Sequence, residues 1–185
     1  MVASLNISAR KSGIVHKRHH MQQLMRERWV GIMAFQETHM TEDLTSQLDN
    51  LFGQNLRLIY SPDLENTNTR GVAFMINRSL IKADKVEMET LILGRMMLIL
   101  APWKDRSRLV ALNIYAPNKP REMRAFWITI GDKLREMRPT RPDIMLRDLN
   151  LVEDALDRIP SSQGDAQAME LLREVRNDLD MTNRW

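Results

Sequence analysis

Residues 143–160 read DIMLRDLNLVEDALDRIP, a short apolar run that leads into Asp148, then Asn150, then a polar segment. Side chains alternate across a strand, so Asp148 and Asn150 are expected to share one face. An acid and an amide at the end of a buried strand are typical of the active sites of sheet enzymes. A turn that begins with an acid explains the same two residues equally well. The rest of the chain has to distinguish these two interpretations.

The composition is that of a globular protein. The chain has 185 residues, of which 43% are hydrophobic and 28% charged. This length predicts that residues 1–185 form a single domain. No apolar run approaches the roughly 18 residues of a membrane span, and the N-terminal segment is too polar for a signal peptide. Because there is no cysteine, disulfides, thiolate catalysis and cysteine-ligated zinc are excluded. We therefore expect an intracellular protein with no membrane partner.

The charge of the chain is mildly basic. Lysine and arginine number 27 against 24 acidic residues, which gives a net charge of +3. Basic residues cluster in ARKSGIVHKRHH (9–20) and KLREMRPTRP (133–142). This balance suits a polyanionic partner but is also common in domains with other roles, so the charge alone does not indicate nucleic-acid binding.

Apolar runs along the chain predict eight strands. Most runs are continuous rather than alternating, as expected for strands that are covered on both faces. The runs are VASLNI (2–7), GIMAFQ (31–36), LRLIYS (56–61), GVAFMIN (71–77), METLIL (88–93), RMMLILAPW (95–103), RLVALNIYA (108–116) and DIMLR (143–147).

Helices are predicted near residues 19–28, 41–53, 120–137 and 165–179. Thr41 is a suitable N-cap for the second helix and Gly53 a suitable stop, while Pro120 favours the first turn of the third. Short connections at INRSLIKAD (76–84), LGR (93–95) and KDRSR (104–108) predict hairpins with antiparallel pairing. The order of elements indicates a mixed sheet packed between helices.

Four of the predicted strands end in an acid, an amide or a phenol. Each such residue taken alone could be a turn former or a cap. Together they offer the carboxylate and amide oxygens that a hard divalent cation prefers when strand ends converge. The residues are Asn6, Glu37, Tyr115 with Asn118, and Asp148 with Asn150.

The sequence resembles the endonuclease/exonuclease/phosphatase superfamily, which has the DNase I-like fold. The nearer resemblance is to the endonuclease domains of non-LTR (LINE-type) retrotransposons of basidiomycete fungi. QETH, YAPN and the acid-x-Asn strand end, at this order and spacing, form the specific part of the signal. The matching segments run in the family's order from residue 3 to residue 185: ASLNI, MRERWVGIMAFQETH, RGVAFMIN, LNIYAPN, AFWITIGDKL, RDLNLVEDALDRIP and LDMTNRW.

The resemblance implies an α/β (α+β) chain that folds as a four-layer α/β/β/α sandwich, incomplete at the C-terminus. It also implies a phosphodiesterase site that uses Mg²⁺ or Mn²⁺. Glu37 matches the metal-binding glutamate of the family, and Asn6 matches the asparagine that supports the metal.

The remaining site residues follow from the same resemblance. Tyr115 and Asn118 match residues that contact or orient the scissile phosphate. Asp148 matches the aspartate that positions or deprotonates the attacking water, and Asn150 matches its orienting partner. The implied partner is the DNA phosphate backbone, which the net positive charge favours, and the implied location is nuclear.

Two features depart from the family. Its members carry an aspartate and a catalytic histidine near the C-terminus, whereas this chain has no histidine beyond residue 39. We therefore expect the catalytic histidine to be absent, and loss of such a group typically lowers the rate by about 10²–10⁴-fold. Arg147 replaces a family glycine in what is expected to be an interior strand, where a guanidinium must be paired or must displace packing.

The four histidines are assigned to other roles. Those at 16, 19 and 20 lie in a strongly basic segment without a nearby acid, which favours a solvated helix face over a metal site. His39 follows Glu37 and is expected to be a turn residue at the rim of the site. Trp103, Trp127 and Trp185 are expected to pack in the core or on the surface rather than to stack on bases.

Three interpretations of function stay open. The first is an impaired metal-dependent DNA endonuclease of retroelement origin, and the second is a non-catalytic remnant that binds nucleic acid or metal weakly. The third is a phosphatase of the same fold that acts on inositol phosphates or sphingomyelin. A chain that ends before the family's last strands would also leave a sheet edge unpaired, so self-association through that edge is expected.

Overall fold

The computed structural model describes residues 1–7, 14–61, 71–104, 107–137, 141–150 and 166–179. The chain divides into two compact units. The first is Met1–Tyr115 with Asp143–Asp148, and the second is Ala116–Pro142 with Leu149–Trp185. That residues 1–185 act as one domain stays a prediction.

All eight predicted strands are present, and the predicted helices are found with shifted ends. The first helix begins at Ile14 rather than near residue 19. The elements are β1 (Val2–Asn6), α1 (Ile14–Glu27), β2 (Ile32–Gln36), α2 (Glu42–Phe52), β3 (Leu56–Ser61), β4 (Val72–Asn77), the short 3₁₀ helix η1 (Ala83–Lys85), β5 (Glu87–Ile92), β6 (Met96–Trp103), β7 (Ser107–Tyr115), α3 (Pro120–Glu136), β8 (Ile144–Asp148) and α4 (Ala166–Asp178).

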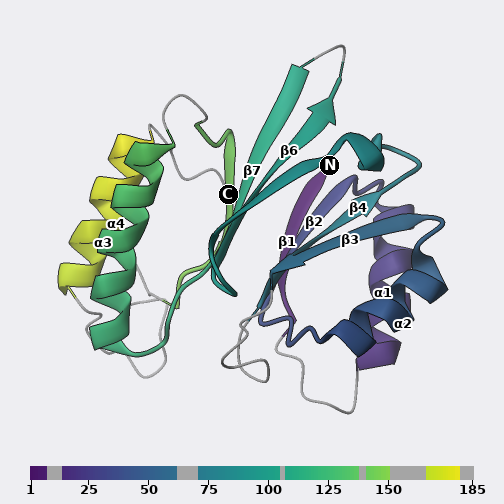
Figure 1. The fold of residues 1–185 in the computed structure, drawn as a ribbon, viewed down its shortest axis with the longest axis horizontal. Helices are drawn as coiled ribbons and strands as arrows, with labels where there is room; N and C mark the ends of the chain where they lie inside the picture. The colour runs from purple at the N-terminus through teal and green to yellow at the C-terminus, as the bar shows by residue number, and fades with distance from the viewer. Residues whose placement is uncertain (8–13, 62–70, 105–106, 138–140, 151–165, 180–185) are drawn as a thin grey trace. The chain divides into compact units, whose positions relative to one another are not determined.

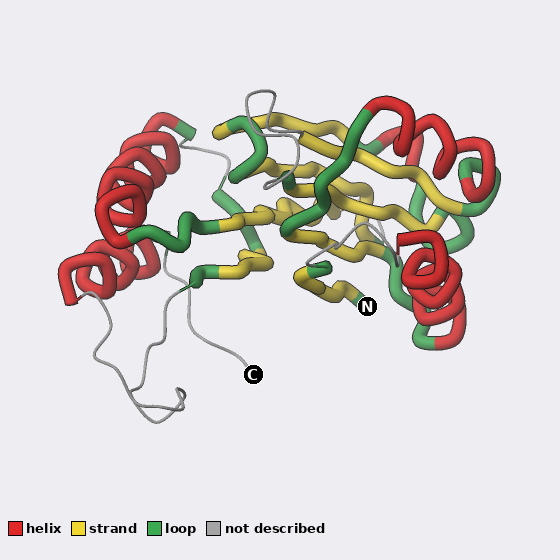
Figure 2. Tube along the Cα trace, turned by 90° about the horizontal axis from the view of Figure 1, so that it is seen from below, coloured by secondary structure: helices red, strands yellow, loops and turns green. Residues whose placement is uncertain are grey.

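The strands form two mixed sheets within the first unit. The first sheet has the order β1-β2-β4-β3 and the second has the order β5-β6-β7-β8. In each sheet one pair is parallel, β1 with β2 and β7 with β8, while the other pairs are antiparallel. Helices α1 and α2 cover the outer face of the first sheet (Figures 1 and 2).

Alternation along the strands of the first sheet separates two apolar cores. On β2, Ile32 and Ala34 face the second sheet, whereas Met33 and Phe35 face α1 and α2. The strand β4 alternates in the same way and is buried along its whole length. A strand covered on both faces has no polar side, which explains the continuous apolar runs in the sequence.

The hairpin predicted at residues 76–84 is wrong. The strands on either side, β4 and β5, belong to different sheets, and the segment between them crosses from one sheet to the other. Along the crossing, Ile81, Ala83 and Val86 are buried in the core between the sheets. These apolar side chains favour passage through the core over a tight solvent-exposed turn. The other two predicted hairpins, β5–β6 and β6–β7, are confirmed.

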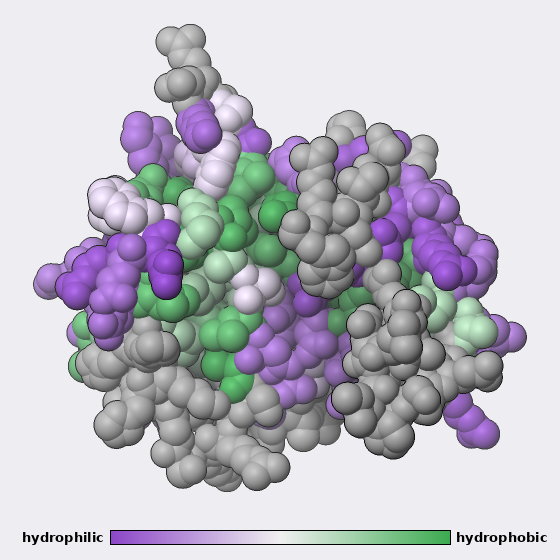
Figure 3. Space-filling view, turned by 180° about the vertical axis from the view of Figure 1, so that it is seen from behind, coloured by the Kyte–Doolittle hydropathy of each residue, from purple (hydrophilic) through white to green (hydrophobic). Residues whose placement is uncertain are grey.

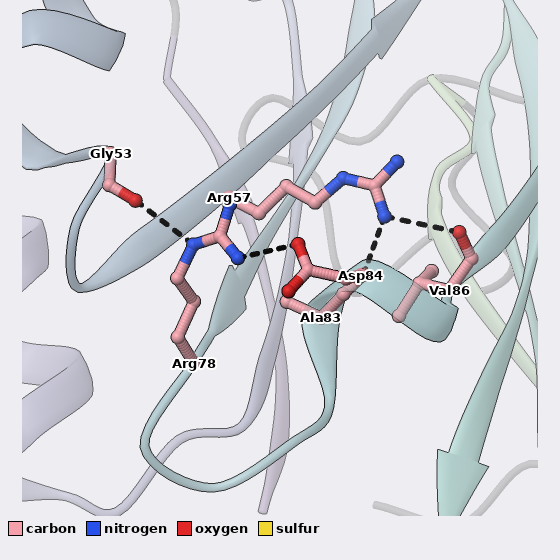
Figure 4. A network of polar contacts seen from close by, with 6 residues as sticks. All are labelled: Gly53, Arg57, Arg78, Ala83, Asp84 and Val86. Carbon is pink, nitrogen blue, oxygen red and sulfur yellow. Dashed lines mark hydrogen bonds and ion pairs between the residues drawn. The ribbon is translucent and has the colours of Figure 1, made fainter.

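Two arginines hold this crossing in place (Figure 4). Arg57 of β3 donates through Nη1 to the main-chain oxygens of Ala83 at 2.5 Å and Val86 at 3.2 Å. Arg78 donates through Nε to the main-chain oxygen of Gly53 and through Nη1 to Asp84, at 2.9 Å and 2.7 Å. The crossing is therefore tied by charged donors to the end of α2 and to β3.

A pair of buried amides joins the two sheets. Asn113 of β7 is fully buried, and its Nδ2 donates to the main-chain oxygens of Phe35 at 3.0 Å and Ala73 at 2.9 Å. Phe35 and Ala73 face each other across the β2–β4 ladder. Gln36, also buried, donates through Nε2 to Asn113 Oδ1 at 2.7 Å. Each of these hydrogen bonds links a strand of one sheet to a strand of the other.

Helix α1 ends with an unusual residue. The amide of Val30 donates to the oxygen of Met25 at 2.9 Å, and the amide of Trp29 donates to the oxygen of Arg26 at 3.4 Å. This pair of bonds defines a Schellman motif, in which Trp29 holds the left-handed position that glycine usually occupies. Its φ is +52°. Val30 and Met25 are both buried, which supplies the hydrophobic contact that accompanies the motif.

The second unit contains α3 and α4. The helices lie side by side, and Arg135 Nε approaches Asp178 Oδ2 at 3.5 Å (Figures 1 and 2). Trp127 of α3 is buried against Phe126, so its predicted role in packing is confirmed. Trp185 lies outside the described residues. Among the described residues, no helix is long and apolar enough to cross a membrane.

The structure does not place Arg147 in an interior strand. It lies on β8, whose one partner in the described sheet is β7, and it is half-buried. Arg147 is therefore not enclosed between two neighbouring strands of the described sheet. Self-association through an open sheet edge stays a prediction.

We expect Asn113→Ala to lower the free energy of unfolding by about 3 kcal/mol, because it removes the hydrogen bond from the Gln36 amide to Asn113 and the bonds from Asn113 to two buried main-chain oxygens. Urea titration followed by circular dichroism measures this change. The matched control is Asn50→Ala on the exposed side of α2, which should change the same quantity by less than about 0.5 kcal/mol. Similar small effects of both substitutions would show that the buried amides contribute nothing beyond an exposed one.

We expect Trp29→Gly to raise the free energy of unfolding by about 1 kcal/mol, because glycine adopts a positive φ without steric conflict. Thermal and urea unfolding measure the gain. Trp29→Ala removes the same ring but keeps a Cβ in the left-handed region, so it should give no such gain. Equal stability of the glycine and alanine variants would contradict the strain at this position.

Candidate phosphodiester site

Four of the six predicted site residues lie at the carboxyl ends of two parallel strand pairs. Asn6 ends β1, and Glu37 directly follows β2. Tyr115 ends β7 and Asp148 ends β8, and the two residues are partners in the ladder. Parallel strands bring their carboxyl ends to the same edge of a sheet, so each pair of residues is brought together by the pairing itself.

The side chains between the two sheets become polar toward this edge. On β7, Ala111 is followed two residues later by Asn113 and then by Tyr115. On β8, Ile144 and Leu146 pack in the core between the sheets, and the next residue on that face is Asp148. Because every second residue of a strand shares one face, the same inner surface is apolar in the core and polar at its end.

Two hydrogen bonds connect the sheets at the polar edge. Tyr115 Oη donates to Glu37 Oε1 at 2.6 Å, and the two residues are 78 positions apart in the chain. Asn6 Nδ2 donates to Asp148 Oδ2 across 142 positions. Each bond joins one sheet to the other, and each holds one oxygen of a carboxylate. The arrangement places two acids, an amide and a phenol together within the first unit.

Glu37 has a strained backbone, with φ of +54°. A left-handed conformation is uncommon in residues other than glycine, asparagine and aspartate, and such outliers gather at functional sites. The neighbouring Thr38 is buried, and its amide donates to the oxygen of Gly71 at 3.2 Å. Gly71 has φ of +128°, and a Cβ added to it would lie 2.5 Å from Thr38 Oγ1. A glycine is therefore required beside the segment that carries Glu37.

The hydroxyl of Tyr115 is held in its protonated form. Burial raises the pKa of Tyr115 well above its usual value of 10.0, and the hydrogen bond to Glu37 and the charge of Asp148 act in the same direction. Arg95 opposes them: its guanidinium carbon lies 4.9 Å from the centre of the Tyr115 ring. Nη1 of Arg95 also donates to the main-chain oxygen of Tyr115 at 3.3 Å. The tyrosine therefore acts as a hydrogen-bond donor to the Glu37 carboxylate.

The two remaining predicted residues belong to the second unit. Asn118 is exposed in the segment before α3. Asn150 donates through Nδ2 to the main-chain oxygen of Ala116 at 2.7 Å and has φ of +49°. The expectation that Asp148 and Asn150 share a strand face is wrong, because β8 ends at Asp148 and the chain turns into a left-handed conformation at Asn150.

Three residues of this region were missed by sequence reasoning. Gln36 and Asn113 lie inside the segments QETH and LNIYAPN that carry the resemblance, yet only their neighbours were singled out. Their signal is an amide within an apolar strand, which requires a buried partner. Arg95 follows the tight turn at Gly94 and opens an apolar run, but nothing in that pattern specifies a contact with Tyr115. The side chains of His16, His19 and His20 and the segment LVEDALDRIP lie outside the described residues.

The carboxylate oxygens of Glu37 and Asp148 meet part of what a hard divalent cation requires as ligands. Magnesium in proteins commonly uses one or two carboxylates and keeps several waters, which Glu37 and Asp148 can provide. No group of three or more histidine, cysteine, aspartate or glutamate side chains with metal-binding geometry occurs in the described part of the chain. His39 has φ of +46° and is half-buried two residues after Glu37.

Neither a protein-family model nor a curated protein matches the chain. Its similarity to known proteins lies in the fold. The crystal structure of the AP endonuclease LMAP from Leishmania major matches 95% of this chain with a TM-score of 0.73 at 15% identity. An AP endonuclease from Archaeoglobus fulgidus also matches 95% of the chain, with a TM-score of 0.68 at 15% identity. D. rerio TDP2, complexed with single strand DNA product, matches 83% of the chain with a TM-score of 0.57 at 12% identity.

These matches confirm the DNase I-like α+β fold that was expected from the sequence. The chain spans 65% of the Leishmania structure, 69% of the Archaeoglobus structure and 61% of the TDP2 structure. At such low identity the likeness extends to the fold and leaves the chemistry to be argued from the residues.

We expect the free energy of unfolding of the metal-free protein to fall more steeply between pH 10 and 11 than that of Tyr115→Phe. Unfolded Tyr115 releases its proton near pH 10, whereas the raised pKa keeps the proton on folded Tyr115, so rising pH favours unfolding. Below pH 10 this stabilisation is fully present. Urea titrations in EDTA at several pH values measure the difference. Tyr60→Phe, which retains Tyr115, should keep the steeper fall, and parallel pH curves for wild type and Tyr115→Phe would contradict the assignment.

Proposed function

We propose that this chain is a metal-dependent phosphodiesterase domain with impaired activity, and that its substrate is the DNA backbone. The observation that carries the proposal is the pairing of Glu37 with Tyr115 and of Asn6 with Asp148 at one edge of the two sheets. Further support comes from the folds that the chain resembles, which include two AP endonucleases and TDP2 complexed with single strand DNA product. The net charge of +3 suits a polyanionic substrate.

Glu37, supported by Asn6, would hold Mg²⁺ or Mn²⁺. When bound there, the ion would offset the charge that develops on the phosphoryl oxygens. Tyr115 orients the Glu37 carboxylate through its hydroxyl and keeps that oxygen hydrogen-bonded. Asp148, oriented by the amide of Asn6, would align a water for in-line attack and accept its proton. By the resemblance, Asn118 matches a residue that contacts or orients the phosphate, and Asn150 matches the orienting partner of the family's aspartate.

The proposal has two further parts: the domain is of retroelement origin, and its activity is reduced. The first rests on the resemblance of LNIYAPN and LVEDALDRIP to LINE-type endonuclease domains. The second rests on the histidines, since these 185 residues have none beyond His39 to polarise the phosphate. Because the proposed substrate is DNA, we also expect the protein to be located in the nucleus. The second candidate is a non-catalytic remnant that binds nucleic acid or metal weakly, and it is favoured because these 185 residues contain no histidine after His39.

We expect a protein of these 185 residues to bind Mn²⁺, and Glu37→Gln to weaken that binding at least about 10-fold, because the substitution removes a ligand charge. Isothermal titration calorimetry measures the affinity. Glu42→Gln, on an exposed face of α2, is the matched control and should bind as the wild type does. Wild-type affinity in Glu37→Gln would overturn the metal site.

Activity is a separate readout. With Mg²⁺ or Mn²⁺, we expect the wild-type chain to nick supercoiled plasmid no faster than the Glu37→Ala, Asp148→Asn double variant. Nicking by the wild type that disappears in the double variant would overturn the reduced activity while supporting the phosphodiesterase site.

A further inference from the structure

Trp29 is the most exposed of the large hydrophobic side chains in the described residues. Its exposed fraction is 71%, against 60% for Met1 and 59% for Leu51. Apolar side chains do reach the surface elsewhere, as the green patches in Figure 3 show. Trp29 differs from the others because its backbone has a positive φ, a conformation that disfavours residues with a large side chain.

The left-handed position at the end of α1 is one that glycine fills without strain. A tryptophan there destabilises the folded chain, and burial of the ring does not offset this, since most of the ring is in solvent. Outliers of this kind are a reason to look for a role outside the fold. An exposed indole held on a rigid turn is also pre-oriented to stack on a planar ligand.

The charges beside Trp29 indicate what that ligand is. Arg28 directly precedes Trp29, Arg26 lies three positions before it and accepts the Trp29 amide through its main-chain oxygen, and both arginine side chains are exposed. The one acid among them, Glu27, is held by Gln23, whose Nε2 donates to its Oε1 at 2.6 Å. An aromatic ring with adjacent guanidinium groups is the combination that binds single-stranded nucleic acid, because the ring stacks on a base while the cations meet the phosphates.

We propose that Trp29, Arg26 and Arg28 form a binding surface for single-stranded nucleic acid. An unpaired base stacks on the Trp29 ring, and the two arginines neutralise flanking phosphates. A duplex, whose bases are already stacked on one another, offers no free face for the ring. These three residues make up the Trp29 surface.

The Trp29 surface is separate from the candidate phosphodiester site. Trp29 lies three positions before β2 and Glu37 directly follows it, so the whole strand of 5 residues, with a length of roughly 17 Å, lies between them. Binding at the Trp29 surface needs neither a metal nor the site carboxylates. The proposal therefore goes beyond the proposed function and stands or fails independently of it.

Binding of a fluorescein-labelled oligothymidylate of about 15 nucleotides, followed by anisotropy in EDTA, tests the proposal. Trp29→Gly should weaken binding at least about 5-fold, the lower end of what loss of one stacked base costs. Because this variant is expected to be more stable than the wild type, the loss cannot be assigned to unfolding. Trp29→Phe, which keeps an aromatic face, should retain most of the affinity. Leu51→Ala, which removes another exposed apolar side chain, should leave it unchanged.

The salt dependence tests the arginines. In the Arg26→Gln, Arg28→Gln variant the slope of log affinity against log salt should decrease by about 1.4, the value for two phosphate contacts to a single strand. Equal affinities of the wild type and Trp29→Gly would overturn the proposal, as would equal affinities for the oligothymidylate and its duplex. So would a change of oligomeric state in Trp29→Gly on gel filtration without a change in DNA binding, which would indicate a contact between copies of the chain. None of these outcomes depends on whether the chain binds Mn²⁺ or nicks plasmid.

Discussion

The hydrogen bonds of Asn113 are the interaction on which the candidate site depends. A single buried side chain on β7 is bonded to β2 and β4 through main-chain oxygens and to Gln36 through its own oxygen. Apolar sheet faces can slide over one another at little cost, whereas a buried amide with every partner in place tolerates one register. Gln36 directly precedes Glu37, and Asn113 lies two residues before Tyr115. The amides therefore set the relative positions of the residues that meet at the edge.

The core between the sheets accordingly serves two purposes. Its apolar part stabilises the packing of the sheets, and its last layer is polar because Asn6, Tyr115 and Asp148 continue the same inner faces. Each polar group at this end is bonded to a group on the other sheet. Local strain at Glu37 and the close approach of Gly71 to Thr38 lie in the same place. Such strain is sustained when the surrounding packing determines the conformation, as the buried strands β2 and β4 do here.

The likeness to AP endonucleases at 15% identity has a physical explanation in this arrangement. The fold requires apolar side chains at alternate positions, parallel pairing at two places and a connection that crosses between the sheets. Many combinations of aliphatic residues satisfy these requirements, and this chain uses methionine at several of the buried positions. The few polar residues within the strands are less exchangeable, because each needs a specific partner.

The sequence by itself determined where the strands and helices lie and which residues end the strands, because alternation, capping and apolar runs act over a few neighbouring residues. Thr41 caps α2 by accepting the Leu44 amide through its side chain, as its local chemistry predicts, and Gly53 follows the last residue of the helix. Only the tertiary structure decided that residues 76–84 cross between the sheets, since two arginines and three buried side chains outweigh the local tendency to turn. It also decided which strand ends face each other. Asn6 and Asp148 are 142 positions apart, and no local pattern specifies a hydrogen bond that exists only once two sheets have packed.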